Sequence, residues 1–338
     1  MKRRSIVIVT GVFLAVNCCL VLASFIAPYS PTQQHREFAY APPAKIHFVD
    51  AAGHFHVHPF VYELEAADNG DLSYRDNPER MFRVRFVQRS EGNLHLFCVD
   101  PPGHIFVLGT DGFGRDLFSR VLFGSQVSLA AALLATLLAL MIGTGLGAAA
   151  GYFGGYADTL IMRFSELSLA LPWLYLLLAI RAALPLHIAP GKMFMLVSAV
   201  IGTLGWARPA RLVRGVVLSE RERSFVTAAR GFGASEWYLL RRHVLPQTAG
   251  IVITQAMVLI PQFIVAEATL SFLGLGMSEP LPSLGNLLAD LQHLQVMTSY
   301  WWMAAPLAVL VLVSLSYFSV ADAMHARLSR REMRTSHA

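Results

Sequence analysis

The chain has 338 residues, of which 55% are hydrophobic and only 14% are charged, with a formal net charge of +5 and a pI near 9.3. Soluble globular domains carry fewer apolar and many more charged residues, so this composition excludes an ordinary soluble protein. Because the basic residues flank apolar runs, the positive charge indicates orientation in a membrane rather than binding to nucleic acid.

Six apolar runs reach the roughly 20 residues that are needed to cross about 30 Å of hydrocarbon. They cover residues 6–27, 127–150, 160–184, 194–214, 248–273 and 301–322. Lysine and arginine gather at residues 2–4, 208–242 and 327–334, whereas 276–299 has neither. The positive-inside rule therefore predicts six spans with both termini in the cytoplasm. The first run is longer than the core of a signal peptide, which predicts an uncleaved helix at 1–28.

Residues 29–108 form the one long segment between spans, and the six-span topology places it outside the cytoplasm. Apolar and polar residues alternate at 81–87 and 94–99, which predicts strands, and turns are predicted at 68–71, 91–93 and 101–103. We therefore expect a small β-rich insertion.

Three histidines of this insertion, His54, His56 and His58, alternate with Phe55 and Val57 and would share one face of a strand. Neutral imidazoles in this spacing suit nickel, copper or zinc. The alternative is the polar face of an exposed strand, which the sequence favours because no neighbouring carboxylate or thiol completes a metal site.

In the second span, Gly143, Gly147 and Gly151 follow one another at four-residue spacing. Such a stripe lets another helix approach closely in lipid, although a hinge is the alternative. Pro172, Pro209 and Pro261 are expected to bend their spans.

The charged segment 215–246 lies between the fourth and fifth runs and has helix signals of its own. Ser219 and Glu222 stand in capping-box spacing, Gly233 permits a turn, and Ser235 can cap a second helix that Pro246 would end. A helix-turn-helix in a cytoplasmic loop suits a membrane protein that receives mechanical work from a soluble partner. The alternative is an ordinary basic loop.

This segment resembles the EAA loop of ABC importer permeases, whose pattern is Glu-Ala-Ala, three residues, Gly, nine residues and Ile-x-Leu-Pro. The residues that the resemblance assigns to ATPase coupling are Thr227, Ala228, Ala229, Gly233, Ala234, Ser235 and Pro246. Thr227 replaces the glutamate and His243 the isoleucine, and the lost carboxylate removes one ion pair that could strengthen docking to a partner.

Further stretches resemble the dipeptide and oligopeptide importer permeases in particular. They are the Gly-Thr-Asp-x-x-Gly-Arg-Asp loop at 109–116, with residues 151–156, 266–276 and 282–286. Together these similarities cover residues 105–330. In the first stretch, Arg115 and Asp116 are candidates for the translocation path or for a structural polar role. Residues 116–122 could form an interfacial amphipathic helix.

Glu267 is an ionisable residue in the outer third of the fifth span, which makes it a functional hypothesis by default. It could line the translocation path and meet the amino terminus of a peptide. The alternative, which we favour, is a structural role in which Glu267 pairs with Arg115 or an amide.

No phosphate-binding loop, nucleophile elbow or metalloprotease signature occurs in the sequence. We expect a non-enzymatic chain without cofactors of its own, with ATP and magnesium bound by partner subunits.

The resemblance implies an all-α polytopic membrane protein of the ABC importer permease type in a bacterial inner membrane. Its expected parts are the first transmembrane helix at 1–28, the insertion at 29–108, the permease domain at 109–326 and a basic cytoplasmic tail at 327–338. The implied partners are a second permease subunit, two ATPase subunits and an extracytoplasmic solute-binding protein. Peptides are the expected cargo, with nickel or another small solute as the alternative. A secondary transporter would be expected to show internal repeats, and none is evident.

Overall fold

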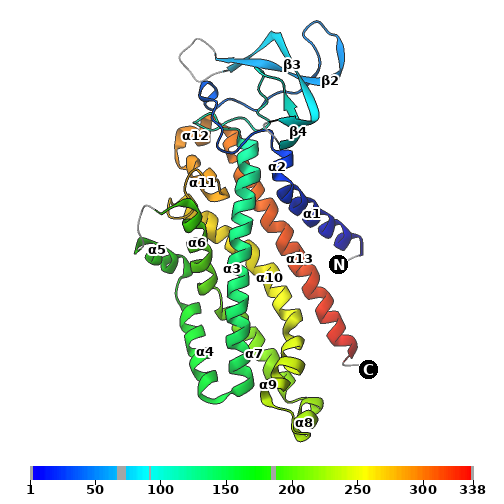
Figure 1. Ribbon diagram of the computed structural model, residues 1–338, viewed down its shortest axis with the longest axis vertical. Helices are drawn as coiled ribbons and strands as arrows, with labels where there is room; N and C mark the ends of the chain where they lie inside the picture. The colour runs from blue at the N-terminus through cyan, green and yellow to red at the C-terminus, as the bar shows by residue number, and fades with distance from the viewer. Residues whose placement is uncertain (1–2, 67–73, 91–92, 184–187, 336–338) are drawn as a thin grey trace. The chain divides into compact units, whose positions relative to one another are not determined.

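The computed structural model describes residues 3–66, 74–90, 93–183 and 188–335 (Figure 1). The turns predicted at 68–71 and 91–93 fall wholly or mostly outside these residues, as do Lys2 and the side chains of the basic tail. The chain divides into two compact units. We call Met1–Phe13, Leu129–Leu270 and Val313–Ala338 the helical unit, and Leu14–Ser128 and Ser271–Leu312 the sheet unit.

The helical unit is built from long apolar helices and a short pair of polar ones (Figure 1). The helices that lie wholly or partly in it are α1 (Arg3–Val21), α3 (Leu117–Phe153), α4 (Gly155–Ala170), α5 (Trp173–Ala182), α6 (Pro190–Leu204), α7 (Ala207–Arg221), α8 (Ser224–Gly231), α9 (Glu236–Leu239), α10 (Ala249–Phe272) and α13 (Ala305–Thr335). A π-helical turn at Leu240–Val244 and a 3-10 turn at Leu245–Thr248 join α9 to α10.

Among the described residues, three helical stretches are long and apolar enough to cross a membrane: Leu117–Phe153, Glu236–Phe272 and Trp301–Met324. The pair α6 and α7 makes a fourth if its 44° bend lies within one span, and the apolar part of α1, Val7–Val21, is shorter. A mostly helical membrane protein is thus confirmed, while six spans remain a prediction.

Two of the expected spans are broken, and a third starts earlier than expected. The run 160–184 is two helices, because Leu171 precedes Pro172 and takes an extended backbone that cannot continue α4. The run 194–214 breaks between α6 and α7, with Pro209 in the first turn of α7, where its missing N–H does little harm. The helix expected at 116–122 is present from Leu117 onwards, as the first part of α3. Pro261 lies inside an unbroken α10.

The glycine stripe of α3 packs against α7, as predicted. A Cβ atom on Gly143 would lie 2.8 Å from the Trp206 carbonyl oxygen, and one on Gly151 would lie 2.8 Å from that of Arg214. A Cβ on Gly147 would overlap the Ala210 carbonyl oxygen. The two backbones can therefore approach only because these side chains are absent.

The sheet unit contains an antiparallel sheet in the order β1 (His47–Val49), β2 (Phe55–Ala66), β3 (Tyr74–Ser90) and β4 (Asn93–Val99). The strands predicted at 81–87 and 94–99 are confirmed within β3 and β4. Val61, Val84 and Ile105 form the buried core beside the sheet. The register of β2 against β3 shifts between Tyr62 and Glu63.

A second core of the sheet unit gathers the start of α3 and the segment that follows α10. That segment contains α11 (Leu284–Ala289) and α12 (Leu294–Ser299), and α2 (Ala23–Ile26) also belongs to this unit. Leu117, Leu287 and Met303 are among the residues buried there. Ser283 begins α11 with a complete capping box to Asn286.

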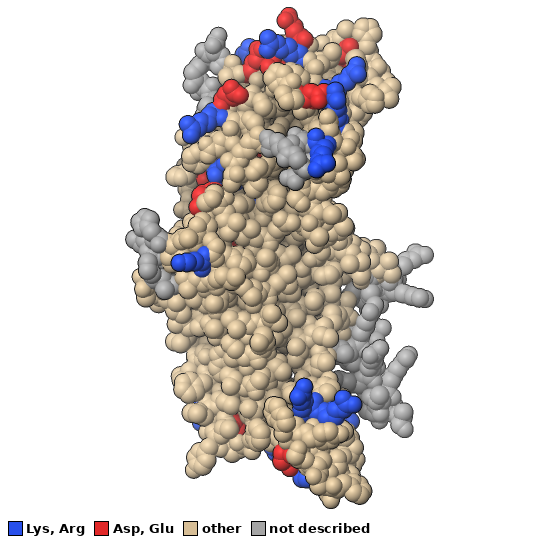
Figure 2. Space-filling view, viewed as in Figure 1, with Lys and Arg blue, Asp and Glu red and all other residues tan. Residues whose placement is uncertain are grey.

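Charged side chains are unevenly spread over each unit. In the helical unit, the view in Figure 2 shows an almost uncharged surface over the long helices, with charges gathered around α8 and α9. Such an apolar helix surface is what hydrocarbon requires. The sheet of the other unit carries both signs of charge (Figure 2).

Candidate functional site

The segment expected to couple to an ATPase folds as two short helices joined by a turn. The turn is at Gly233, whose φ of +85° favours glycine. The Ser235 hydroxyl accepts a hydrogen bond from the Tyr238 N–H at 3.3 Å and so caps α9, as predicted.

The limits of these helices differ from the prediction. Ser219 and Glu222 do not begin a helix, because α7 continues to Arg221 and α8 begins at Ser224. Pro246 does not end one either. It lies near the start of a 3-10 turn after a π-helical turn, and the altered hydrogen-bond pattern of these turns accommodates proline within a continuous helical stretch.

An apolar cluster fixes this two-helix segment to the long helices. Val226 of α8 and Leu239 of α9 are completely buried, and they pack with residues of α3 and α7. The other buried members of the cluster are Ala148, Tyr152, Val213, Val217, Leu240 and Val244. The cluster therefore joins α8 and α9 directly to α3 and α7.

Polar contacts reinforce the same attachment. The Arg221 guanidinium donates to the Gly151 carbonyl oxygen at 2.9 Å, and Arg230 pairs with Glu236 at 2.8 Å. The Tyr152 hydroxyl of α3 also donates to the Glu236 carboxylate. Earlier in α7, Arg214 forms a bidentate ion pair with both carboxylate oxygens of Asp158 in α4, at 2.5 and 2.6 Å.

The predicted coupling residues divide into an exposed group and a half-buried group. Thr227, Ala228, Gly233, Ser235 and Pro246 are exposed. Ala229 and Ala234 are half-buried against the apolar cluster, so these two positions help to anchor the segment.

Sequence reasoning missed the aromatic side chains of this segment. Phe232 is 92% exposed and Trp237 is 65% exposed, while Phe225 and Tyr238 are also exposed. Large aromatic side chains in a charged loop between two apolar runs were a signal for a binding surface, because Trp, Tyr and Phe are enriched where proteins bind one another.

In the sheet unit, Arg115 belongs to a network of ion pairs around Asp111. Arg115 and Arg120 both donate to Asp111, at 2.7 and 2.6 Å, and both also reach Glu279, at 2.9 and 2.5 Å. Asp111 Oδ1 additionally accepts from the Phe113 and Arg115 N–H groups, which closes the glycine-rich loop. Within this unit, Arg115 holds the loop in shape.

Asp116, just before α3, is completely buried and accepts from the Ser119 N–H and hydroxyl at 2.8 and 2.6 Å. Burial raises the pKa of Asp116 to about 7 despite these hydrogen bonds. Its hydrogen bonds to Ser119 make Asp116 the cap at the start of α3.

Glu267 lies in α10 of the helical unit and its side chain is fully buried. Whether it serves structure or meets a transported molecule stays a prediction, and we continue to favour the structural role.

The three histidines of the insertion do not share one environment. His56 Nε2 lies 3.0 Å and His54 Nδ1 3.4 Å from a carboxylate oxygen of Asp50. Hydrogen bonds from His56 and from the His54 N–H lower the pKa of Asp50 to about 2. Among the described residues, no group of three or more metal-binding side chains is arranged to hold an ion.

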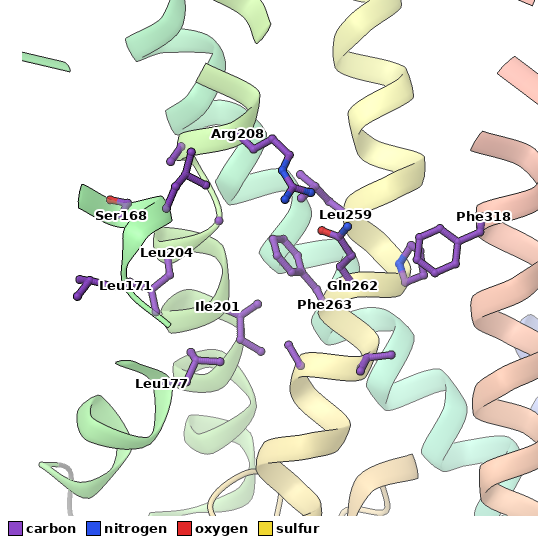
Figure 3. A pocket seen from close by; sticks show the side chains of 16 residues that line it. Ser168, Leu171, Leu177, Ile201, Leu204, Arg208, Leu259, Gln262, Phe263 and Phe318 are labelled. Carbon is purple, nitrogen blue, oxygen red and sulfur yellow. The ribbon is translucent and has the colours of Figure 1, made fainter. Parts of the chain in front are cut away.

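A cavity of about 500 Å³ opens between the helices of the helical unit (Figure 3). Its walls come from α4, α5, α6, α7 and α10, with Phe318 of α13. The lining is mostly apolar, and its polar side chains are Ser168, Arg208 and Gln262. This balance is typical of small-molecule sites.

Comparison with known proteins agrees with this architecture. Residues 143–333 match the family described as the binding-protein-dependent transport system inner membrane component. The probable D,D-dipeptide transport system permease protein DdpC of Escherichia coli is 37% identical over 222 residues, which are 66% of this chain and 72% of DdpC.

Two other similar proteins are also permease components of peptide transport systems. The oligopeptide transport system permease protein OppC of Escherichia coli is 37% identical over 68% of this chain and 73% of its own. The dipeptide transport system permease protein DppC of Bacillus subtilis is 33% identical over 68% of this chain and 71% of its own. The chain therefore belongs to the family of inner-membrane permease components of binding-protein-dependent transport systems.

Proposed function

We propose that this chain is a permease subunit of an ATP-driven ABC importer for di- or oligopeptides. The observation that carries the proposal is the anchored two-helix segment α8–α9, with its exposed aromatic side chains, in a chain of this transport family. The names of the relatives, which specify dipeptide and oligopeptide transport, support peptides over nickel as cargo.

The proposed assembly contains a second permease subunit, two ATPase subunits and an extracytoplasmic solute-binding protein. ATP and magnesium are bound by the ATPase subunits. In the proposed topology both termini and segment 215–246 face the cytoplasm, and residues 29–108 face outwards, in agreement with the distribution of arginine along the chain.

In the proposed mechanism, α8 and α9 sit in a groove of an ATPase subunit. Closure of the ATPase pair on ATP moves them, and the buried contacts of Val226 and Leu239 pass the movement to α3 and α7. The spans then switch between outward and inward access, so nucleotide and cargo bias the same two-state element.

The decisive experiment is ATP-driven uptake of labelled di- and tripeptides, with nickel as comparison, by the full complex in proteoliposomes. Gly233→Arg places a long charged side chain where the segment turns, and we expect a loss on the order of tenfold in peptide uptake with normal membrane insertion. Gly233→Asn is the matched control, because asparagine tolerates positive φ and adds little volume.

Normal peptide-stimulated ATPase activity in the Gly233→Arg complex would refute the coupling role. Uptake of nickel but not of peptides by the unaltered complex would refute the peptide cargo.

A further inference from the structure

Arg208, an exposed residue, is the basic side chain among those that line the cavity of the helical unit. Arg208 and Gln262 point into the space between α7 and α10, beside the ring of Phe263 (Figure 3). Over the part of the chain that the structure describes, the side chains of Arg208 and Gln262 form no hydrogen bond or ion pair with another residue. Arg214 of the same helix, by contrast, is held by both carboxylate oxygens of Asp158. Arg208 and Arg214 of α7 therefore lie in different surroundings.

Arg208 belongs to the predicted span 194–214. Helices α6 and α7 have 15 residues each and meet at the 44° bend, so each covers about 22 Å of the path. If the two helices form one span, hydrocarbon about 30 Å thick includes the bend, and Arg208 lies in the first turn after it. An ionisable group at this depth is expensive and indicates a function.

The Arg208 guanidinium supplies the positive charge of this cavity. The amino end of α7 has no side-chain cap and carries partial positive charge, but the carboxyl end of α6 beside it carries partial negative charge. A negatively charged ligand would therefore be stabilised mainly by the Arg208 side chain.

We propose that the cavity is a transient binding site for the transported peptide, in which Arg208 binds the terminal carboxylate. Gln262 has an amide that can both donate to and accept from a peptide bond. The apolar wall, including Leu177 and Ile201, receives the side chains of the peptide. This inference rests on the proposed function and adds to it the group that the permease recognises.

A peptide carboxylate fits these observations better than a lipid phosphate. Lipid phosphates lie at the membrane interfaces, whereas Arg208 follows the interior bend. The cavity volume of about 500 Å³ also lies within the usual range for small-molecule sites and suits a short peptide.

The test compares uptake of two tripeptides that differ only in a free carboxylate or a carboxamide at the C-terminus. The full complex is reconstituted with saturating binding protein, whose own selectivity is the same for every permease variant and cancels in the comparison. For Arg208→Gln we expect kcat/KM for the free acid to fall roughly tenfold, as for loss of one charge-assisted hydrogen bond, with the amide unaffected. Arg208→Lys keeps the charge and should lose only part of the preference.

The matched control is Arg163→Gln, which removes an exposed arginine of α4 that pairs with Glu166 and does not line the cavity. It should leave the ratio of acid to amide uptake unchanged. Thermal unfolding of each variant complex shows whether folding is intact, and Arg208→Lys provides the test if Arg208→Gln does not fold.

Equal losses for acid and amide, or no loss for either, would overturn the proposal while peptide transport itself stands. Failure of the unaltered complex to transport either peptide would instead refute the proposed function. Repeating the assay in vesicles of zwitterionic phosphatidylcholine alone tests for an anionic lipid as the ligand. If the effect of Arg208→Gln on uptake requires anionic lipid and is equal for both peptides, Arg208 binds lipid and the proposal is wrong.

Discussion

In the sheet unit, Asp111 and Arg120 form an ion pair, and each of the two side chains is only 2% exposed. In the helical unit, Arg230 and Glu236 of the α8–α9 segment are 44% and 51% exposed. The first pair has lost its water and depends on its partners, so it fixes the geometry of the loop around it. The second pair remains in water, where either charge can be exchanged for one on another protein. The buried Asp111–Arg120 pair therefore stabilises the conformation of its loop, whereas the exposed Arg230–Glu236 pair belongs to a surface that can bind another protein.

The strongest test of this comparison removes the shared carboxylate of the buried network. Asp111→Asn leaves Arg115 and Arg120 with Glu279 alone, and we expect the free energy of unfolding of the sheet unit to fall by about 3–5 kcal/mol. Thermal unfolding of the purified protein measures the loss. The control is Asp76→Asn, which breaks the exposed pair with Lys45 and should have little effect. A similar result for both variants would mean that burial does not distinguish these pairs.

A second test concerns the packing of α7 against α3 in the helical unit. Gly147→Ala puts a Cβ against the Ala210 carbonyl oxygen, and the forced separation of α3 and α7 should destabilise the protein by about 1–3 kcal/mol. Gly145→Ala, two residues away, has no atom within 4 Å of the added Cβ and should stabilise the same helix by up to about 1 kcal/mol. Opposite signs in thermal unfolding would support backbone contact as the main attachment. A neutral Gly147→Ala would contradict it.

The buried carboxyl groups of the sheet unit should also make its stability depend on pH. Burial raises the pKa of Asp116 to about 7 and that of Asp290 to about 6. Aspartate in an unfolded chain has a pKa of about 3.9, so the folded unit retains protons that the unfolded one has lost. Its stability is therefore greatest below about pH 4 for these groups and falls as pH rises to about 7, by up to about 1.4 kcal/mol per pH unit for each group.

Unfolding measured across this pH window, for the unaltered protein and for Asp116→Asn, checks the expectation. The variant cannot ionise at this position and should show a shallower decline. An unchanged slope would assign the pH dependence to other groups.

The smallest effect is expected at the exposed pair. Glu236→Gln is the same type of change as Asp111→Asn, from acid to amide, but the Arg230 partner stays in water. We expect its unfolding midpoint to match that of the unaltered protein. A marked shift would show that the bond from Tyr152 to Glu236 gives this pair a structural role, and the contrast between the two regions would weaken.

The sequence was informative wherever a local pattern decides the structure. The run 248–273 corresponds closely to α10, strand alternation located β3 and β4, and Ser235 caps its helix as the spacing indicated. The spacing of Gly143, Gly147 and Gly151 also predicted close packing of a helix. These features depend on residues within a few turns of one another.

Features that depend on distant residues could not be predicted in this way. Glu279 meets Arg120 across 159 positions of the chain, and no local pattern links them. Pro246 looked like a helix end because the π-helical turn before it cannot be recognised from residue types. Pro209 indicated a bend in the run 194–214, but the residue types alone did not place the break between Leu204 and Ala207, before the proline.

That bend has a consequence for hydration. The Gly205 N–H still donates to the Ile201 carbonyl oxygen at 3.1 Å, but Pro209 has no N–H to donate to the Gly205 carbonyl oxygen, and Gly205 lines the cavity. Hydrocarbon cannot satisfy a free carbonyl oxygen, so in a span it has to face protein or water. We therefore expect the cavity to admit water when the transporter works. A solute that passes through it exchanges one set of hydrogen bonds for another, and is not stripped of solvent before it crosses.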